Sequence, residues 1–400
     1  MSNYESKAKV RLYINNTDVT DSYYNIRIFQ SIDSPTWSAD IAMLDAKNLT
    51  ENIPIQHGSE VRISVETQHN VETDDNVEFL FYVYKITDKK LNNQHAESYV
   101  LKLVSKPFLE NNLIKINERF RVKTTDIIAQ IANKSFQDFA VEIGSDCDNL
   151  TSCLIPKWNP FTAIAWLLRI AHKAGKADFM FFQNELISFK IDSIQSMYND
   201  SKNRLSPVLK YKVSGNDDKK EIDVYNIIKH EYHHVDVQQN IQNGYYASTN
   251  ASYDFFKKEW KEETVRNEKA GSDNRVSSEL NSMISENTES TVITFIPCVA
   301  DIYGDGIPTP YEESDKWVAS RRMSLQELDS EKFSAQTYGS VGMYRWLGKH
   351  IMIDLPAFDT TTDDFYSKFR KGYYLTTAIA HFITPSTYIC NFEFVKLELN

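Results

Sequence analysis

The end of the chain repeats the pattern of apolar and polar positions found near its beginning. Residues 57–66 and 347–356 each contain a glycine followed by apolar residues at every second position. After a polar stretch, each leads to an aromatic-rich alternating segment, at 78–87 and 373–383. Because alternation with a period of two is typical of half-buried strands, each copy predicts a β module. A final alternating strand closes each unit, at 99–104 and 388–395. The sequence therefore predicts an internal duplication.

Strand patterns fill nearly all of residues 8–106. Apolar residues alternate with polar ones at 9–14, 26–31 and 36–42, and polar turns separate these segments. Several short strands at such spacing predict an antiparallel barrel or sandwich. A strand-like pattern returns at 207–238.

The pattern changes to helical periodicity after Pro107. Threonines at 124–125 can cap a helix that begins at Asp126, and apolar residues then recur with i, i+3, i+4 spacing. Asn159 and Pro160 suit the start of a second, mostly apolar helix, and Gly175 suits its end. A strand pair follows, at 178–182 and 186–191. Residues 107–200 therefore predict a small α+β module.

A polar segment separates this module from the C-terminal repeat. Residues 239–294 are rich in Asn, Ser, Glu and Lys, and the charge run at 257–267 predicts an exposed face. Ser314 or Asp315 can then cap a helix that continues to Leu328.

Composition narrows the class of protein. With 42% hydrophobic and 25% charged residues, the 400-residue chain resembles a soluble globular protein of several domains. Aromatic residues make up 12% of the chain, which favours strands and packed interfaces. The net charge of −11 argues against non-specific nucleic-acid binding, since a surface that follows phosphates needs clustered Lys and Arg.

Neither export nor membrane insertion is indicated. The N-terminus lacks an apolar signal segment, and no apolar run approaches the roughly 20 residues that span a bilayer. We therefore predict no membrane partner. The four cysteines lack CxxC spacing and predict reduced thiols, with a disulfide between Cys147 and Cys153 as the alternative.

One motif resembles a zinc site. His230, Glu231 and His234 satisfy H-E-x-x-H, which on a helix can bind zinc through both histidines and use the glutamate as general base. Residues 224–238 can be drawn as a helix, but their β-branched residues also favour a strand, and no cap precedes them. The sequence favours an exposed strand. A zinc-dependent hydrolase remains the enzymatic alternative.

A second motif resembles a calcium loop. Asp301, Asp305 and Glu312 match the ligand spacing, but Tyr303 stands where an oxygen ligand belongs and Pro308 stiffens the loop. A Gly/Pro turn explains the segment better. The sequence contains no nucleophile elbow, P-loop or G-x-G-x-x-G motif. No catalytic, cofactor-binding or metal-binding residue is therefore predicted, and the chain is not expected to be an enzyme.

Four stretches together resemble a known family. They are SPTWSADIAMLDAKNLTENIPIQHGSEVR at 34–62, IPKWNPFTAIAWLLRIAHKAGKADFMFFQNELISFKI at 155–191, DVYNIIK at 223–229, and the C-terminal unit at 348–397. Their order is similar to that in the central baseplate hub protein of contractile-tailed phages, a family related to the hubs of secretion-system spikes. The likeness covers most of the chain, whereas 239–294 matches nothing in that family.

The resemblance implies a mainly β, α+β fold with two tube-like antiparallel β-barrel modules and a small α+β module, able to form a ring. The expected domains are a first barrel at 1–106, an α+β domain at 107–206, a second barrel from 207–238 and 315–400, and a polar insertion at 239–314. Three chains with two barrels each would supply six similar modules, which joins a trimeric spike to a six-fold tail tube.

The resemblance also implies a function and partners. The expected role is a homotrimeric structural hub that binds the central spike, the tail tube or its initiator, baseplate wedge proteins and the tape measure protein. DNA would pass through its channel without specific binding, and an acidic lining would suit that passage. The expected location is the virion tail baseplate, assembled in the host cytoplasm. The non-enzymatic alternative is the tail-tip hub of a non-contractile phage or an injection system.

Overall fold

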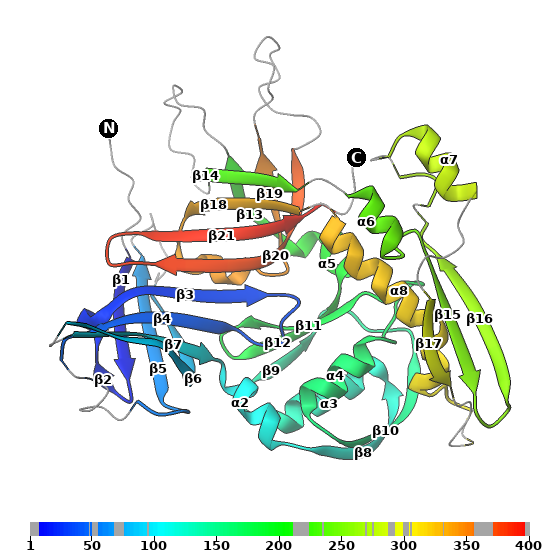
Figure 1. Ribbon diagram of the computed structural model, residues 1–400, viewed down its shortest axis with the longest axis horizontal. Helices are drawn as coiled ribbons and strands as arrows, with labels where there is room; N and C mark the ends of the chain where they lie inside the picture. The colour runs from blue at the N-terminus through cyan, green and yellow to red at the C-terminus, as the bar shows by residue number, and fades with distance from the viewer. Residues whose placement is uncertain are drawn as a thin grey trace, which may run out of the picture.

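The structure, a computed structural model, describes most of the chain (Figure 1). The described residues are 8–47, 49, 55–67, 76–93, 96–210, 224–233, 236–268, 270–273, 276–286, 293–298, 304, 306–330, 332–355 and 371–396. Most of the strands belong to one 13-stranded sheet that runs through two β units. An α+β unit and a smaller three-stranded sheet complete the fold.

The first β unit is antiparallel throughout. Its strand order is β1-β5-β6-β7-β4-β3. The short β2 (Thr17–Asp18) pairs antiparallel with the end of β1, and the 3-10 turn η1 (Thr20–Ser22) follows it. Buried apolar residues alternate with exposed ones along these strands, as the sequence predicts. The six main strands are β1 (Ala8–Ile14), β3 (Tyr23–Ser31), β4 (Ser38–Asp45), β5 (Glu60–Thr67), β6 (Asn76–Asn93) and β7 (Ala96–Val104).

The second β unit is a closed barrel of six strands. Its order is β13-β19-β20-β21-β18-β14, and pairing of β13 with β14 closes the ring. The strands are β13 (Arg204–Lys210), β14 (Val224–His233), β18 (Lys332–Tyr338), β19 (His350–Asp354), β20 (Gly372–Ile383) and β21 (Tyr388–Val395), with η3 (Val341–Trp346) between β18 and β19. The prediction of a mainly β fold with two similar β modules and an α+β module is confirmed, and the second β module is a closed barrel.

The two β units have the same strand order. In chain order, the six main strands of the first unit occupy the same sheet positions as β13, β14, β18, β19, β20 and β21. One strand differs in direction, because β1 pairs antiparallel to β5 whereas β13 pairs parallel to β19. The reversal of β13 lets it pair also with β14, so the second unit closes.

The glycines that begin the sequence repeat occupy equivalent places. Gly58 N donates to Val83 O at 2.7 Å, and Gly348 N donates to Thr376 O at 2.9 Å. The residue that accepts from the glycine also donates its own backbone N–H to the carbonyl oxygen of the residue after the glycine. These bonds are Val83 N to Ser59 O and Thr376 N to Lys349 O. Each glycine has a positive φ, +87° at Gly58 and +71° at Gly348, which favours glycine over other residues.

Alanine at these two glycines should have unequal effects. At Gly58 a Cβ would meet nothing within 4 Å, so Gly58→Ala costs only the left-handed conformation, about 1 kcal/mol. At Gly348 a Cβ would lie 3.0 Å from Phe182 Cζ and 3.3 Å from Met197 Sδ. Gly348→Ala should therefore lower the free energy of unfolding more than Gly58→Ala, as measured by denaturant titration. Equal losses would contradict the crowding at Gly348.

Bulges also coincide in the two β units. The bulge in β3 matches the one in β14, and the first of three irregularities in β6 matches the one in β20. Because a bulge is a local feature of the backbone, matching positions support a common origin for the two units. The four matching bulges lie between Tyr23 and Asn25 in β3, Ile227 and Lys229 in β14, Val83 and Lys85 in β6, and Thr376 and Ala378 in β20.

The α+β unit follows β7 and has its own apolar core. Its sheets pair β8 with β10, and β11 with β12 and β9. The elements are α2 (Lys106–Leu113), β8 (Ile116–Lys123), α3 (Thr124–Ser135), β9 (Ala140–Ile143), β10 (Leu150–Trp158), α4 (Pro160–Leu168), β11 (Phe179–Glu185), β12 (Ser188–Ser193), α5 (Ile194–Asn199) and η2 (Ser201–Asn203).

Two predicted helix bounds in this unit are wrong. The first helix begins at Thr124 rather than Asp126, because Thr124 is buried and its hydroxyl lies 2.8 Å from that of Thr151 instead of capping the helix. The second ends at Leu168 rather than near Gly175. After Leu168 the chain forms a turn and then an isolated bridge between Lys173 and Lys176, so the helix does not continue to Gly175.

The predicted polar insertion contains an ordered sheet of order β16-β15-β17. The helix α8 packs against all three strands and crosses the predicted boundary at 314–315. The charge run lies in β16, whose side chains are mostly exposed, as predicted. The elements are α6 (Val237–Gln242), β15 (Ala247–Asp254), β16 (Glu259–Arg266), α7 (Ser278–Glu286), β17 (Ile293–Cys298) and α8 (Pro310–Ser330).

Trp37 joins the α+β unit to both β units. Its backbone N and indole Nε1 donate to Gln183 of β11, at 3.1 Å to Oε1 and 2.7 Å to the carbonyl oxygen. The Trp37 ring lies 6.3 Å from Phe79 of the first β unit and 6.0 Å from Tyr344 of the second. With only 1% of its surface exposed, Trp37 lies where the three units meet.

The cysteines that the structure describes with their side chains are free thiols. Cys147, Cys153 and Cys390 are buried, so the alternative of a disulfide between the first two is wrong. Burial raises the pKa of the Cys153 thiol to about 12, which keeps it protonated. Among the described helices, none has the length and apolar character that would let it cross a membrane.

Candidate functional site

The two β units are joined through their backbones. Strand β3 pairs antiparallel with β20 from Ile26↔Ile383 to Ser31↔Ala378, which we call the seam. At its end, Ile32 N donates to Thr377 O at 3.0 Å. The seam creates one antiparallel sheet of order β14-β18-β21-β20-β3-β4-β7-β6, with four strands from each unit (Figure 1).

A polar cluster lies on the buried side of the seam. His381 Nδ1 is 2.8 Å from the Tyr388 hydroxyl and 3.2 Å from Cys390 Sγ, and its Nε2 is 3.3 Å from Gln30 Oε1. The Tyr388 hydroxyl donates to Ser340 O at 3.3 Å. Burial lowers the pKa of His381 from 6.5 to about 3, so its ring is neutral at pH 7. A neutral buried imidazole thus links the two units.

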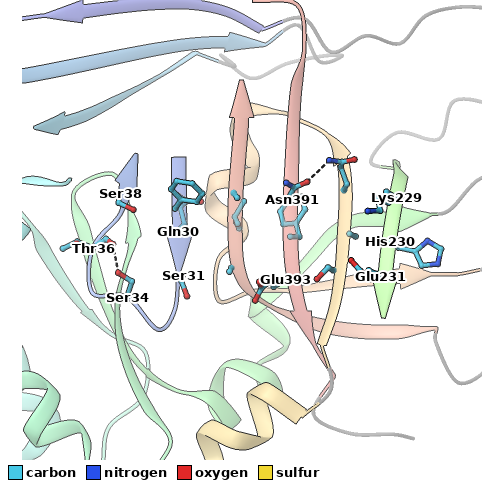
Figure 2. Close-up of a pocket in the computed structure, with 18 residues that line it drawn as sticks. Gln30, Ser31, Ser34, Thr36, Ser38, Lys229, His230, Glu231, Asn391 and Glu393 are labelled. Carbon is cyan, nitrogen blue, oxygen red and sulfur yellow. Dashed lines mark hydrogen bonds between the residues drawn. The ribbon is translucent and has the colours of Figure 1, made fainter. Parts of the chain in front are cut away.

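The opposite side of the seam is a groove of about 600 Å³ (Figure 2). It crosses strands of both units because neighbouring strands present their outward side chains in rows. Most of these side chains are small or polar, which leaves the groove open. The side chains that line it from the strands next to the seam include Phe29, Ser31, Ala378, Ala380, Asn391 and Glu393.

Charges of both signs lie on this face, and several are paired. Asp40 accepts from Arg27 at 3.1 Å and from Lys102 at 2.8 Å, and the Asp40 side chain is 13% exposed. Lys332 lies 3.7 Å from Glu393 across two neighbouring strands. The face is therefore mixed in charge rather than acidic, although the whole chain carries −11.

The H-E-x-x-H motif lies in strand β14, not in a helix. Successive strand residues point to opposite sides, so His230 and Glu231 do not converge (Figure 2). The His230 ring packs 5.8 Å from that of Phe333. Over the described residues Val224–His233 the motif therefore forms a strand, as the sequence favours, and not the helix on which two histidines four residues apart would share a face. His234 lies outside the described residues.

Glu312 of the calcium-like loop has a structural role. Its carboxylate accepts from Thr309 N at 2.7 Å and its own N lies 3.4 Å from Thr309 Oγ1, which is a capping box at the start of α8. Asp301 and Asp305 lie outside the described residues. Within the described residues, no three His, Cys, Asp or Glu side chains are grouped closely enough to hold a metal ion.

Solved structures with the same fold include two phage or bacterial tail proteins and a chain of a Francisella complex. The tail protein from Neisseria meningitidis MC58 has a TM-score of 0.55 at 9% identity, with 98% of each chain covered. The 43 kDa tail protein of prophage MuSo2 from Shewanella oneidensis has 0.55 at 12% identity, again with 98% of each. A chain of the lidded Francisella PdpA–VgrG complex has 0.50 at 10% identity, covering 98% of this chain and 53% of that chain. No family model and no curated protein sequence matches.

The fold is therefore that of phage tail proteins. At these identities the comparison establishes the architecture over nearly the whole chain, and the resemblance to baseplate hub proteins is confirmed at that level. Of the residues that line the groove, the sequence pointed only to His230 and Glu231, and it did so through a zinc motif rather than a groove. The others were not singled out. Their only signal is that they are the polar or small positions alternating with the apolar core positions of β3, β20 and β21.

Proposed function

We propose that this chain is the structural hub of a phage tail baseplate and forms a homotrimeric ring. The observation that carries the proposal is the single antiparallel sheet in which each β unit supplies four strands of matching order. Three copies would place six such four-strand units around one axis. Such a ring would have threefold symmetry, because it contains three chains, and approximate sixfold symmetry, because each chain supplies two similar β units. This symmetry suits a trimeric spike on one side and a six-fold tube on the other.

The groove face suits the lining of a central channel. Its side chains are mainly small or polar, and its ion pairs neutralise Arg27, Lys102 and Lys332 locally. A passing nucleic acid would therefore meet few unpaired cations that could hold its phosphates. This arrangement supports passage of DNA without specific binding, by mixed charge rather than by acidic repulsion.

The proposed ring would have one partner at each end. The spike would bind one rim and the tail tube or its initiator the other, while wedge proteins would bind the outside and the tape measure protein would occupy the channel before ejection. The α+β unit and the β15–β17 sheet lie beside the β units and offer surfaces for such contacts (Figure 1).

The mass of the isolated protein tests the ring. Light scattering coupled to size exclusion should give three times the chain mass of 46.3 kDa at micromolar concentration. A dimer, or a monomer at every concentration, would contradict the proposed ring. Electron microscopy of the same sample should show a threefold particle with a central opening.

A tail-tip or injection-system hub is the second candidate, since one similar chain belongs to the PdpA–VgrG complex. The ring would be the same, and only the particle differs. A gene for a contractile sheath beside this gene would favour the baseplate of a contractile tail. A neighbourhood without a sheath gene would favour the tail tip.

A further inference from the structure

The sheet of the insertion, of order β16-β15-β17, has two faces of different character. Helix α8 packs on one face, where Arg322 donates to the hydroxyls of Ser248, at 2.9 Å, and Thr294, at 2.5 Å. Ser248, Asn250 and Ser252 of β15 are buried on this side. Because successive side chains of a strand alternate between its two sides, the odd-numbered residues of β15 lie on the face turned away from α8.

The pairing register brings aromatic and polar side chains together on that second face. Tyr253 stands directly opposite Trp260, and Thr249 stands opposite Thr264. The two threonine hydroxyls lie 2.8 Å apart across the strands, so both side chains are on the same side. Trp260 Nε1 donates to Glu262 Oε1 at 2.9 Å, two residues along β16. We call these five side chains the outer face.

The aromatic end of the outer face is open to solvent. Trp260 is 55% exposed, and Phe255, in the turn after β15, is 57% exposed. The Phe255 and Tyr253 rings pack edge to face with their centroids 5.3 Å apart, which extends the aromatic surface past the end of β15. The sheet lies at the right of Figure 1, away from the first β unit. A contiguous aromatic patch of this kind, unlike single exposed apolar residues, marks an interaction site.

The exposed rings are held in place by hydrogen bonds. In the turn that carries Phe255, Asp254 Oδ1 accepts from Phe256 N at 2.8 Å and from Lys257 N at 3.0 Å. The Trp260 ring is oriented by the bond from its indole nitrogen to the Glu262 carboxylate. Because the aromatic surface is arranged before a ligand arrives, binding costs little conformational entropy.

The polar groups beside the rings suit neutral hydroxyls better than anions. Glu262 is exposed, and its Oε2 accepts no hydrogen bond from the residues that the structure describes. A carboxylate accepts strongly from a hydroxyl and repels a phosphate or another carboxylate. The hydroxyls of Thr249 and Thr264 add donors and acceptors. Arg266 lies on the same side of β16, at the end of the strand far from Trp260.

We propose that the outer face binds a neutral β-1,4-linked oligosaccharide, with a sugar ring stacked on Trp260 and a hydroxyl bonded to Glu262. The face of an aromatic ring carries partial negative charge and the axial C–H bonds of a pyranose carry partial positive charge, so the two attract. A β-1,4-linked chain is a flat ribbon with such C–H groups on its faces. From Tyr253 to Thr249 the strand extends about 13 Å, which gives room for a short chain. This inference goes beyond the proposed hub and does not depend on it.

Calorimetric titration of the full chain tests this site. The probes are the hexamers of β-1,4-linked N-acetylglucosamine and of β-1,4-linked glucose, and at least one should bind. Trp260→Ala should raise the dissociation constant about tenfold or more, because it removes the stacking surface. Trp260→Phe should retain part of the affinity, and Glu262→Ala should weaken it. Far-ultraviolet circular dichroism should be the same for all these variants, because both side chains are exposed.

Lys261→Ala is the matched control. Lys261 is also exposed, but it lies on the α8 side of β16, where it pairs with Glu263 at 3.1 Å, so this variant should bind as the unmodified protein does. Failure of both hexamers to bind, or binding that Trp260→Ala leaves unchanged, would overturn the proposal. Sedimentation with phosphatidylglycerol vesicles that Phe256→Ala abolishes, without sugar binding, would identify the turn as a lipid contact instead and would equally overturn it.

Discussion

Trp37→Ala should lower the free energy of unfolding by about 3–5 kcal/mol, the range for removing a fully buried Trp side chain. The side chain is 1% exposed, and its removal leaves a cavity between Phe79 and Tyr344. It also leaves the Gln183 carbonyl oxygen without the 2.7 Å bond from the indole. The three units should therefore come apart at lower denaturant concentration, as followed by circular dichroism in guanidinium chloride.

A surface tryptophan provides the matched control. Trp260 in β16 is 55% exposed, and Trp260→Ala should change the free energy of unfolding by no more than about 0.5 kcal/mol. Gln183→Leu should show part of the Trp37→Ala effect, because it removes the Oε1 acceptor used by Trp37 N and by the Ser105 hydroxyl. A loss below 1 kcal/mol for Trp37→Ala would contradict the central position of this residue.

His381→Gln should make the protein less sensitive to acid. The pKa of His381 is lowered by burial from 6.5 to about 3, so the unfolded chain binds a proton between these values and the folded chain does not. Stability is thus complete above pH 6.5 and falls as the pH approaches 3. From pH 7 to pH 4 the loss from this one group is about 3 kcal/mol, at 1.36 kcal/mol per unit of pH below 6.5.

The measurement compares free energies of unfolding at pH 7 and pH 4 in the two proteins. Carboxylates titrate in both, so the difference isolates His381. The control is Tyr388→Phe, which removes the hydroxyl 2.8 Å from Nδ1 but leaves the imidazole buried. This variant should be less stable at pH 7 and keep the acid sensitivity. If the free energy of unfolding fell as much between pH 7 and pH 4 in His381→Gln as in the unmodified protein, the buried neutral histidine would be disproved.

Most strands of the β units could be predicted because one side of each is buried. In β4 and β18, buried residues occupy every second position. The alternation of apolar and polar residues in the sequence therefore follows directly from which side chains face the core. The glycine that opens each repeat was visible for a different reason. Its positive φ excludes most other residues, which leaves a recognisable mark at Gly58 and Gly348.

Other elements left no such mark. Strand β15 is mostly buried but consists of Ala, Ser, Thr, Asn, Tyr and Asp, so hydrophobic alternation does not reveal it. The parallel pairing of β13 depends on partners far away in sequence, and nothing local distinguishes it from the antiparallel β1. The groove depends on the register between units, which brings Ser31 beside Ala378 across 347 residues of sequence.

The helix that closes the insertion shows a third limit. Glu312 fits a calcium-ligand spacing and also a capping box, and a sequence pattern alone supports both interpretations. The structure settles the role of Glu312 through two contacts with Thr309. Helix α8 begins at Pro310, four residues before Ser314. Its start is set by this cap rather than by the apolar spacing within the helix.

The antiparallel ladder between β3 and β20 has a mechanical consequence. A pull directed along these strands would load all its hydrogen bonds simultaneously in shear, whereas a pull across them would break the bonds one after another from the end at Ile26 or Ser31. The molecule should therefore resist a force directed along these strands far better than a force that pulls the two β units apart sideways.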